Sequence, residues 1–290
     1  MSTPGSPGQP KTPQRKFPMS LERLSTPKPG SPAAVPAAAV RTSMSRPAAS
    51  SPRRPAPLAT PPAGLGLDSE SARRRMVDRL RSLGIRDEAV LGAMALVPRH
   101  LFVDAALAAQ AYEDTSLPIG LSQTISKPSV VSRMIELLMA GPQARSAGSL
   151  GKVLEVGTGC GYQAAVLARL SRSVLSVERL KPLHEKARDL LAPIRAASTA
   201  GSAHIRLVYG DGMLGHAPNA PYDSIISAAG GESLPQAWLD QLSIGGRLVA
   251  PWFDPARGSQ VILSVDRTTT GFQRSLHEGV RFVPLKSGVD

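Results

Sequence analysis

Residues 152–162, Lys-Val-Leu-Glu-Val-Gly-Thr-Gly-Cys-Gly-Tyr, decide the fold. The apolar side chains of Val153, Leu154 and Val156 favour a buried strand of a parallel sheet. Three glycines follow at alternate positions, and residues 163–170 have the pattern of a helix. A strand, a glycine-rich turn and a helix start form the cofactor crevice of a doubly wound sheet. The glycines let the backbone approach a ligand, and the helix start offers free N–H donors.

The rest of the chain predicts an α/β fold. After the turn, apolar strands alternate with helical segments, which favours a doubly wound, mostly parallel sheet with helices on both faces. Residues 272–283 are expected to add an antiparallel edge strand. Helices are also predicted before the turn, and residues 112–128 and 141–151 are expected to be irregular. The expected strands are 174–177, 205–209, 222–228, 246–252 and 260–266, and the expected helices are 70–84, 87–97, 129–139, 182–197 and 234–242.

Composition divides the chain near residue 67. Residues 1–67 hold more than half of the 27 prolines and most of the net charge of +12, with Glu22 as their only acid. Such a stretch buries too little apolar surface to offset its ordering entropy, so we expect a disordered Pro/Ser/Arg-rich tail over 1–67 and one folded domain over 68–290. A nucleic-acid or membrane-surface arm and an organellar transit peptide are the alternatives for the tail.

The single cysteine, Cys160, excludes an intrachain disulfide and argues against a cysteine-based metal cluster, so no metal is expected. No apolar run approaches the ~20 residues of a membrane span. A cytoplasmic, monomeric protein without a membrane partner is the expectation. Nucleic acid is not expected as a partner either, because the basic residues of the tail are scattered and have no interleaved aromatics.

Three acids are predicted at the ends of neighbouring strands, where ligands of such sheets bind. Glu155 comes just before the glycine turn. Glu178 follows Gly157 by about twenty residues, the spacing of an acid that holds ribose hydroxyls. Asp211 is expected to accept a hydrogen bond from an adenine amino group, and Gly212 beside it leaves room for a flat ring. For each acid alone, a helix cap or a surface charge is the alternative.

The turn favours a sulfonium cofactor over a dinucleotide. The dinucleotide pattern G-x-G-x-x-G requires a third glycine where Tyr162 stands. A sulfonium cofactor carries no phosphate and needs no such cradle. The pattern acid-x-G-x-G-x-G is similar to the first motif of S-adenosylmethionine-dependent methyltransferases with a Rossmann-like fold. The residues of the motif expected to bind S-adenosylmethionine are Glu155, Gly157, Thr158, Gly159 and Gly161.

A second stretch makes the resemblance specific. Residues 117–128, Leu-Pro-Ile-Gly-Leu-Ser-Gln-Thr-Ile-Ser-Lys-Pro, resemble the signature loop of protein-L-isoaspartate O-methyltransferases. The resemblance covers about residues 70–286. Further stretches that match the family are Val97-Pro98-Arg99, Phe102-Val103, 155–163, Val177-Glu178-Arg179, Gly210-Asp211-Gly212 and 281–285.

The resemblance implies a protein repair enzyme. It would transfer a methyl group from S-adenosylmethionine to the free α-carboxylate of an L-isoaspartyl residue in a damaged protein, and the ester would return to a succinimide. Isoaspartyl-containing proteins and peptides are therefore the expected substrates. The resemblance gives Ser126 the catalytic role of orienting the acceptor carboxylate through its hydroxyl, whereas the residues alone favour an ordinary loop or N-cap serine before the helix at Pro128. Thr124 and Ile125 are expected to contact cofactor and substrate through backbone groups.

The expected reaction fits the side chains present. A carboxylate with a pKa near ~3.5–4 is already an anion at pH 7, so no general base is required and the five histidines are interpreted as structural or surface residues. Cys160 is interpreted as a small residue of the turn, not as a nucleophile. Lys127 and the Gly230-Gly231 pair depart from the family pattern, which affects only the expected substrate-side detail.

Other functions stay open on sequence grounds. One alternative is a methyltransferase of the same fold that acts on a small molecule or RNA. Another is a non-catalytic nucleic-acid-binding protein driven by the basic tail, and a nicotinamide dehydrogenase is the third. Only the isoaspartate hypothesis requires the Gln-Thr-Ile-Ser loop at residues 123–126.

Overall fold

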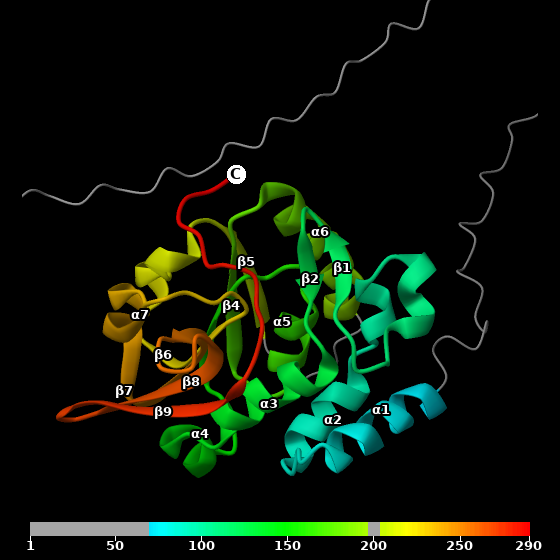
Figure 1. Ribbon diagram of the computed structural model, residues 1–290. Coiled ribbons are helices and arrows are strands. Elements are labelled where there is room, and N and C mark those ends of the chain that lie inside the picture. Colours follow the sequence, from blue (N-terminus) through cyan, green and yellow to red (C-terminus); the bar gives the residue numbers. More distant parts are fainter. Residues whose placement is uncertain (1–69, 197–203) are drawn as a thin grey trace, which may run out of the picture. The chain divides into compact units, whose positions relative to one another are not determined.

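The computed structural model describes residues 70–196 and 204–290, all within one compact unit, Leu58–Asp290. The predicted tail, 1–67, lies outside the described residues. The centre of the unit is a seven-stranded sheet with the order β5-β4-β3-β6-β7-β8-β9 (Figure 1). Its strands are β3 (Lys152–Val156), β4 (Ser173–Glu178), β5 (His204–Tyr209), β6 (Tyr222–Ser227), β7 (Leu242–Asp254), β8 (Ser259–Thr268) and β9 (Gly271–Gly279).

Sheet topology explains where a ligand can bind. Strands β5, β4, β3, β6 and β7 pair in parallel, whereas β8 and β9 pair antiparallel at one edge. From β3 the chain runs outward through β4 to β5, and it then returns to β6 on the other side of β3. The order therefore reverses between β3 and β6, and ligands of open α/β sheets bind at such a point. The predicted fold class, including its antiparallel edge, is confirmed.

Helices cover both faces of the sheet. One apolar core contains residues of α1, α2, α3, α5 and α6, and a second core on the opposite face contains Trp238 and Leu239 of α7. Alternate residues of β3 enter the two cores: Val153 enters the first, and Leu154 and Val156 enter the second. The helices are α1 (Glu70–Ser82), α2 (Glu88–Leu96), α3 (Pro128–Met139), α4 (Pro142–Ala147), α5 (Tyr162–Leu167), α6 (Lys181–Ala196) and α7 (Gln236–Gln241), with the short 3-10 helices η1 (Arg99–Phe102), η2 (Ala105–Gln110), η3 (Gly212–Leu214) and η4 (Ala217–Asn219).

Local chemistry sets several boundaries as predicted. The Asp87 carboxylate accepts hydrogen bonds from the backbone N–H groups of Ala89 and Val90, at 2.9 and 3.1 Å, and so caps α2. Helix α3 begins at Pro128, where a missing N–H costs nothing.

Three segments differ from the expectation. The predicted edge strand 272–283 is β9, which ends at Gly279, so residues 280–283 are not part of it. The stretch 112–128 contains a hairpin of β1 (Leu117–Gly120) and β2 (Gln123–Ile125), and the connector 141–151 contains α4. The hairpin turn consists of Leu121 and Ser122, whose φ angles are 51° and 57°. Hairpin turns of this kind usually carry glycine or asparagine, so the sequence offered no turn pattern here.

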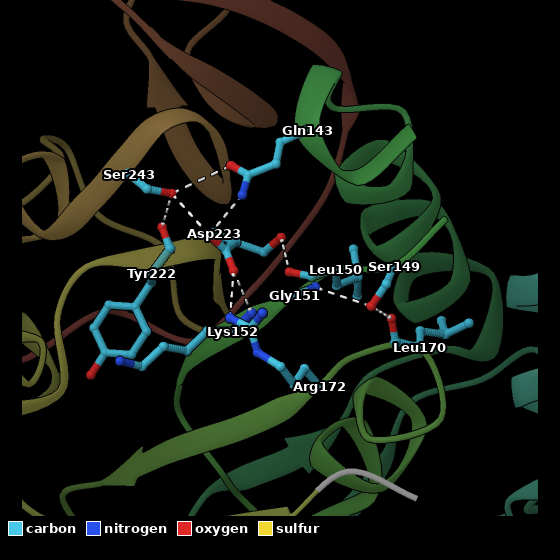
Figure 2. Close-up of polar contacts among 11 residues, drawn as sticks. Gln143, Ser149, Leu150, Gly151, Lys152, Leu170, Arg172, Tyr222, Asp223 and Ser243 are labelled. Carbon is cyan, nitrogen blue, oxygen red and sulfur yellow. Dashed lines mark hydrogen bonds and ion pairs between the residues drawn. The ribbon is translucent and has the colours of Figure 1, made fainter. Parts of the chain in front are cut away.

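A polar cluster joins the elements at the amino ends of the central strands. The Asp223 carboxylate on β6 accepts hydrogen bonds from the Gln143 side chain on α4 and the Lys152 N–H on β3, both at 2.8 Å. Ser243 on β7 and Arg172 before β4 also donate to it, at 3.2 and 3.3 Å (Figure 2). We call these five residues the Asp223 network. It ties one helix and the starts of four strands to a single side chain.

Candidate active site

A cavity of about 730 Å³ lies at the carboxyl ends of β3 and β4. It is bounded by the β1–β2 hairpin, the glycine turn after β3, the start of α6 and the C-terminal segment. A cavity of this size matches the ~300–1,000 Å³ of typical small-molecule sites. The predicted site residues that line it are Thr124, Ile125, Ser126, Gly157, Thr158, Gly159, Glu178 and Gly212, whereas Glu155, Gly161 and Asp211 do not.

Glu178 ends β4 and is the acid most directly placed in the cavity, although only 4% of it is exposed. One carboxylate oxygen accepts a hydrogen bond from the N–H of Gly159 at 2.8 Å, and the other accepts from the N–H of Leu180 at 2.9 Å. These two bonds fix the carboxylate between the glycine turn and the start of α6. Each oxygen keeps a lone pair for a further donor, such as a ribose hydroxyl.

The glycines of the turn have different roles. Gly157 and Gly159 line the cavity with φ angles of 89° and 55°, which favour glycine. A Cβ on Gly159 would lie 3.2 Å from a methyl group of Ile119 in the hairpin. Gly161 lies outside the lining. A Cβ there would be 2.9 Å from Leu191, so this glycine allows α5 and α6 to pack closely.

Glu155 lies beneath the turn and is fully buried. One carboxylate oxygen accepts a hydrogen bond from Ser176 Oγ at 2.5 Å, and Ser176 is 2.6 Å from the Thr158 hydroxyl, which belongs to a cavity-lining residue. The other oxygen, Oε1, has no partner among the described residues, and neither has Nε2 of Gln163, a lining residue. Burial raises the pKa of Glu155 to about 8, and the hydrogen bond from Ser176 opposes that rise.

Asp211 is held by the protein itself. Its Oδ1 accepts from the N–H of Met213 at 2.8 Å, as a cap of η3, and its Oδ2 accepts from the N–H of Gly288 at 2.7 Å. The structure therefore shows the cap expected as its alternative role, and any adenine amino group would share an oxygen with Gly288. The adjacent Gly212 lines the cavity.

The C-terminal segment, 280–290, completes the cavity and was not predicted as part of the site. It passes the ends of β4 and β5 (Figure 1), where Arg179 pairs with the Asp290 carboxylate at 2.7 Å and Lys181 donates its N–H to the Asp290 carbonyl at 3.0 Å. Gly230 bonds to the backbone of this segment, and a Cβ on Gly230 would lie 2.6 Å from Gln260. The glycine that departs from the family pattern thus leaves room for the Gln260 side chain on β8.

Ser126 also lines the cavity, lies between β2 and α3 in the chain, and is half-buried. Its carbonyl accepts a hydrogen bond from Arg99 at 2.7 Å. Within the part of the chain that the structure describes, no partner of the Ser126 hydroxyl is found, so this donor is available to a ligand.

Cys160 lines the cavity as well, but burial raises its thiol pKa to about 11, which leaves the thiol protonated and weakly nucleophilic.

The residues present fit a cationic nucleoside cofactor. Glu178 offers acceptors for ribose hydroxyls, and the orphaned oxygen of Glu155 lies behind the turn with the unpartnered amide of Gln163. Sequence analysis missed Gln163 as a polar lining group, although it is the second residue of α5 and follows the motif directly.

Two kinds of site are not found in residues 70–196 and 204–290. There, no set of three or more His, Cys, Asp or Glu side chains is placed to hold a metal ion. No helix over the same residues combines the length and apolar character needed to cross a bilayer.

Comparison with known proteins identifies close relatives. The family model described as protein-L-isoaspartate(D-aspartate) O-methyltransferase (PCMT) matches residues 71–290. Protein-L-isoaspartate O-methyltransferase of Methylibium petroleiphilum is 63% identical over 230 residues, which are 79% of this chain and 82% of the relative. The enzyme of the same name from Leptothrix cholodnii is 62% identical over 227 residues, which are 78% of this chain and 77% of the relative.

Solved structures share the fold. One protein-L-isoaspartate O-methyltransferase superimposes with a TM-score of 0.63 at 24% identity, covering 75% of this chain and 67% of its own. A Plasmodium falciparum protein described as a β-aspartate methyltransferase (PCMT), solved with S-adenosyl-L-homocysteine, gives a TM-score of 0.61 at 22% identity and covers 74% of this chain and 98% of its own. At these identities the two structures show the fold alone.

Proposed function

The chain belongs to the protein-L-isoaspartate(D-aspartate) O-methyltransferase family, and we propose from this premise how its cavity methylates the free α-carboxylate of L-isoaspartyl residues in damaged proteins. One observation carries the proposal: the Ser126 loop, the glycine turn and Glu178 line the same cavity. Ser126 offers a free hydroxyl for an acceptor, and Glu178 holds a nucleoside.

The proposed cofactor site consists of the predicted residues around the turn. When bound, S-adenosylmethionine supplies an electrophilic methyl group on a cationic sulfur. Glu178 accepts hydrogen bonds from the ribose, and Gly157, Thr158 and Gly159 provide the close backbone surface beside it. Glu155 supports the turn from beneath through Ser176, which donates to Glu155 and is also hydrogen-bonded to the Thr158 hydroxyl. Asp211 and Gly212 border the adenine side, and Gly161 allows α5 to pack.

The proposed acceptor site consists of the loop after β2. Ser126 donates its hydroxyl to one oxygen of the acceptor carboxylate and leaves the other oxygen free to face the methyl donor. Thr124 and Ile125 contact cofactor and substrate through their backbone groups. Joining an anionic acceptor to a cationic donor yields neutral products, so a cavity that excludes water favours the step. Alignment of the two groups is the main task of the protein.

The test is transfer of a labelled methyl group from S-adenosylmethionine to two peptides of the same sequence. One peptide contains L-isoaspartate, and the other contains normal aspartate. We expect label in the isoaspartyl peptide alone, because only that isomer presents a free backbone-derived α-carboxylate at the damaged residue. Equal labelling of both peptides, or of neither, would reject the proposal.

The proposed setting of the enzyme is the cytoplasm, and its proposed working form is a monomer that does not bind nucleic acid. The single cysteine supports a reducing compartment. Gel filtration of the active enzyme tests the monomer, and elution at twice the mass of 30.4 kDa would contradict it.

A further inference from the structure

Arg99, in the 3-10 helix η1, is a fully buried cation, with 0% of its surface exposed. Burying a guanidinium is costly unless its donors are satisfied, and here desolvation lowers the pKa of Arg99. Two main-chain carbonyls accept most of its hydrogen bonds, and Nη1 has no partner in the described residues. The free-energy cost of burying this guanidinium suggests that Arg99 has a role beyond filling the core.

The two carbonyls belong to segments that frame the acceptor loop. Arg99 Nε donates to the carbonyl of Ala111 at 2.8 Å, and Nη2 donates to the carbonyl of Ser126 at 2.7 Å. Hydrogen bonds from a cation are about twice as strong as neutral ones, so the guanidinium anchors the backbone of Ser126 firmly. Since the backbone position sets where the side chain starts, the same bond restricts the Ser126 hydroxyl.

Arg99 also contacts the cofactor side of the cavity. Its guanidinium carbon lies 4.8 Å from the centre of the Tyr162 ring, a cation–π distance. Tyr162 is the first residue of α5, directly after the glycine turn, and it lines the cavity. Phe102, one turn after Arg99, packs edge-on against the same ring at 5.5 Å. One buried side chain therefore bridges the acceptor loop and the cofactor turn.

We propose that Arg99 is a positioning residue that holds the Ser126 hydroxyl at a set distance from the cofactor turn. This inference rests on the function proposed above, and it gives a role to the Val97-Pro98-Arg99 stretch. A planar guanidinium reaches two carbonyls and an aromatic face at once, whereas the ammonium of lysine is a point donor. Arginine is therefore required for the bridge.

A double-mutant cycle tests the proposal. We compare the wild type with Arg99→Lys, Ser126→Ala and the double variant, measuring kcat on the isoaspartyl peptide at saturating S-adenosylmethionine. Because a misplacement of ~1 Å can cost ~100-fold in rate, Arg99→Lys should lower kcat at least ~10-fold when Ser126 is present. In the Ser126→Ala background the same change should lower kcat by no more than ~2-fold, because the aligned hydroxyl is already gone. Binding of S-adenosylhomocysteine should change little.

Arg247→Lys is the matched control. Arg247 is also largely buried, donates to the carbonyl of Leu137 at 2.9 Å and pairs with Asp266 at 2.6 Å, but neither of these two partners lines the cavity. Its replacement should lower the melting temperature and leave the kcat of the folded enzyme unchanged. A merely structural Arg99 would behave in the same way.

The following results would reject the positioning role of Arg99. An equal fall in kcat from Arg99→Lys in both backgrounds would overturn the positioning role. If Arg99→Lys does not fold, Arg99→Gln replaces it, since glutamine keeps one donor for the Ser126 carbonyl without a buried charge. Failure of both variants to fold would assign Arg99 to stability alone and reject the proposal. A wild type that does not label the isoaspartyl peptide is a different result, because it rejects the proposed function itself.

Discussion

The two ends of the central parallel strands differ in how completely one carboxylate at each end, Asp223 and Glu155, is hydrogen-bonded. At the amino ends, Asp223 accepts hydrogen bonds from donors on a helix, two strands and a loop (Figure 2). At the carboxyl ends, Glu155 is fully buried with one oxygen unpartnered, and the Ser126 hydroxyl faces a cavity without a partner in the described residues. Hydrogen-bonded polar groups stabilise a fold, whereas an unpartnered donor of a cavity-lining residue is available to a ligand.

The largest effect on stability is expected at the satisfied end. Asp223→Ala removes the acceptor of the Lys152 N–H and of the Gln143 side chain, so it should cost about 2–3 kcal/mol of unfolding free energy. In a domain of this size that loss lowers the melting temperature by about 5–10 °C. Calorimetry measures the shift. A melting temperature within a degree of the wild type would show that the Asp223 network adds little.

The next largest effect is expected on cofactor affinity. Glu178→Ala removes two proposed hydrogen bonds to ribose hydroxyls, each worth about 1.5 kcal/mol, so the affinity for S-adenosylhomocysteine should fall ~100-fold. Glu185→Ala, an exposed change on the same side of the sheet in α6, is the matched control. Titration calorimetry on both variants decides the point, and equal affinities would remove Glu178 from the cofactor site.

A smaller effect that depends on pH is expected from Glu155→Gln. Burial raises the pKa of Glu155 to about 8 in the folded state, from an ordinary value of 4.5. Between these values the folded protein holds a proton that the unfolded chain has lost, so this group's contribution to stability is complete below 4.5 and is lost as pH rises toward 8. The amide of the Glu155→Gln variant does not ionise, so the variant lacks this pH-dependent contribution to stability.

The difference in melting temperature between Glu155→Gln and the wild type should therefore move in favour of the variant as pH rises from 5 to 8. Thermal melts of both proteins at several pH values measure it, because other titrating groups cancel in the difference. A difference that stays constant over this range would show that Glu155 is ionised throughout.

Features formed by neighbouring residues could be predicted from sequence patterns, whereas features formed by distant segments could not. The β3–turn–α5 unit and the acid ending β4 are local features, so the pattern at 152–162 and the spacing to Glu178 were enough to find them. The Ser126 loop came from a family resemblance and not from its composition.

Features formed by distant segments were not predictable in this way. Asp290 meets Arg179 across more than one hundred residues, and Arg99 meets Ser126 across 27, so neither pair leaves a local pattern. The turn at Leu121 and Ser122 carries no glycine, and α4 is too short to show a clear apolar period. The conformations of this turn and of α4 depend on tertiary contacts rather than on a local sequence pattern.

The most direct test of the account is the turnover of Ser126→Ala on the isoaspartyl peptide at saturating S-adenosylmethionine, with Asp223→Asn measured beside it. A hydrogen bond to a charged acceptor is worth ~1.5–3 kcal/mol, so we predict that kcat of Ser126→Ala falls ~10- to 150-fold with an unchanged melting temperature. Asp223→Asn should show the reverse, a lower melting temperature with kcat retained. Methylation by Ser126→Ala at the rate of the wild type would contradict the account.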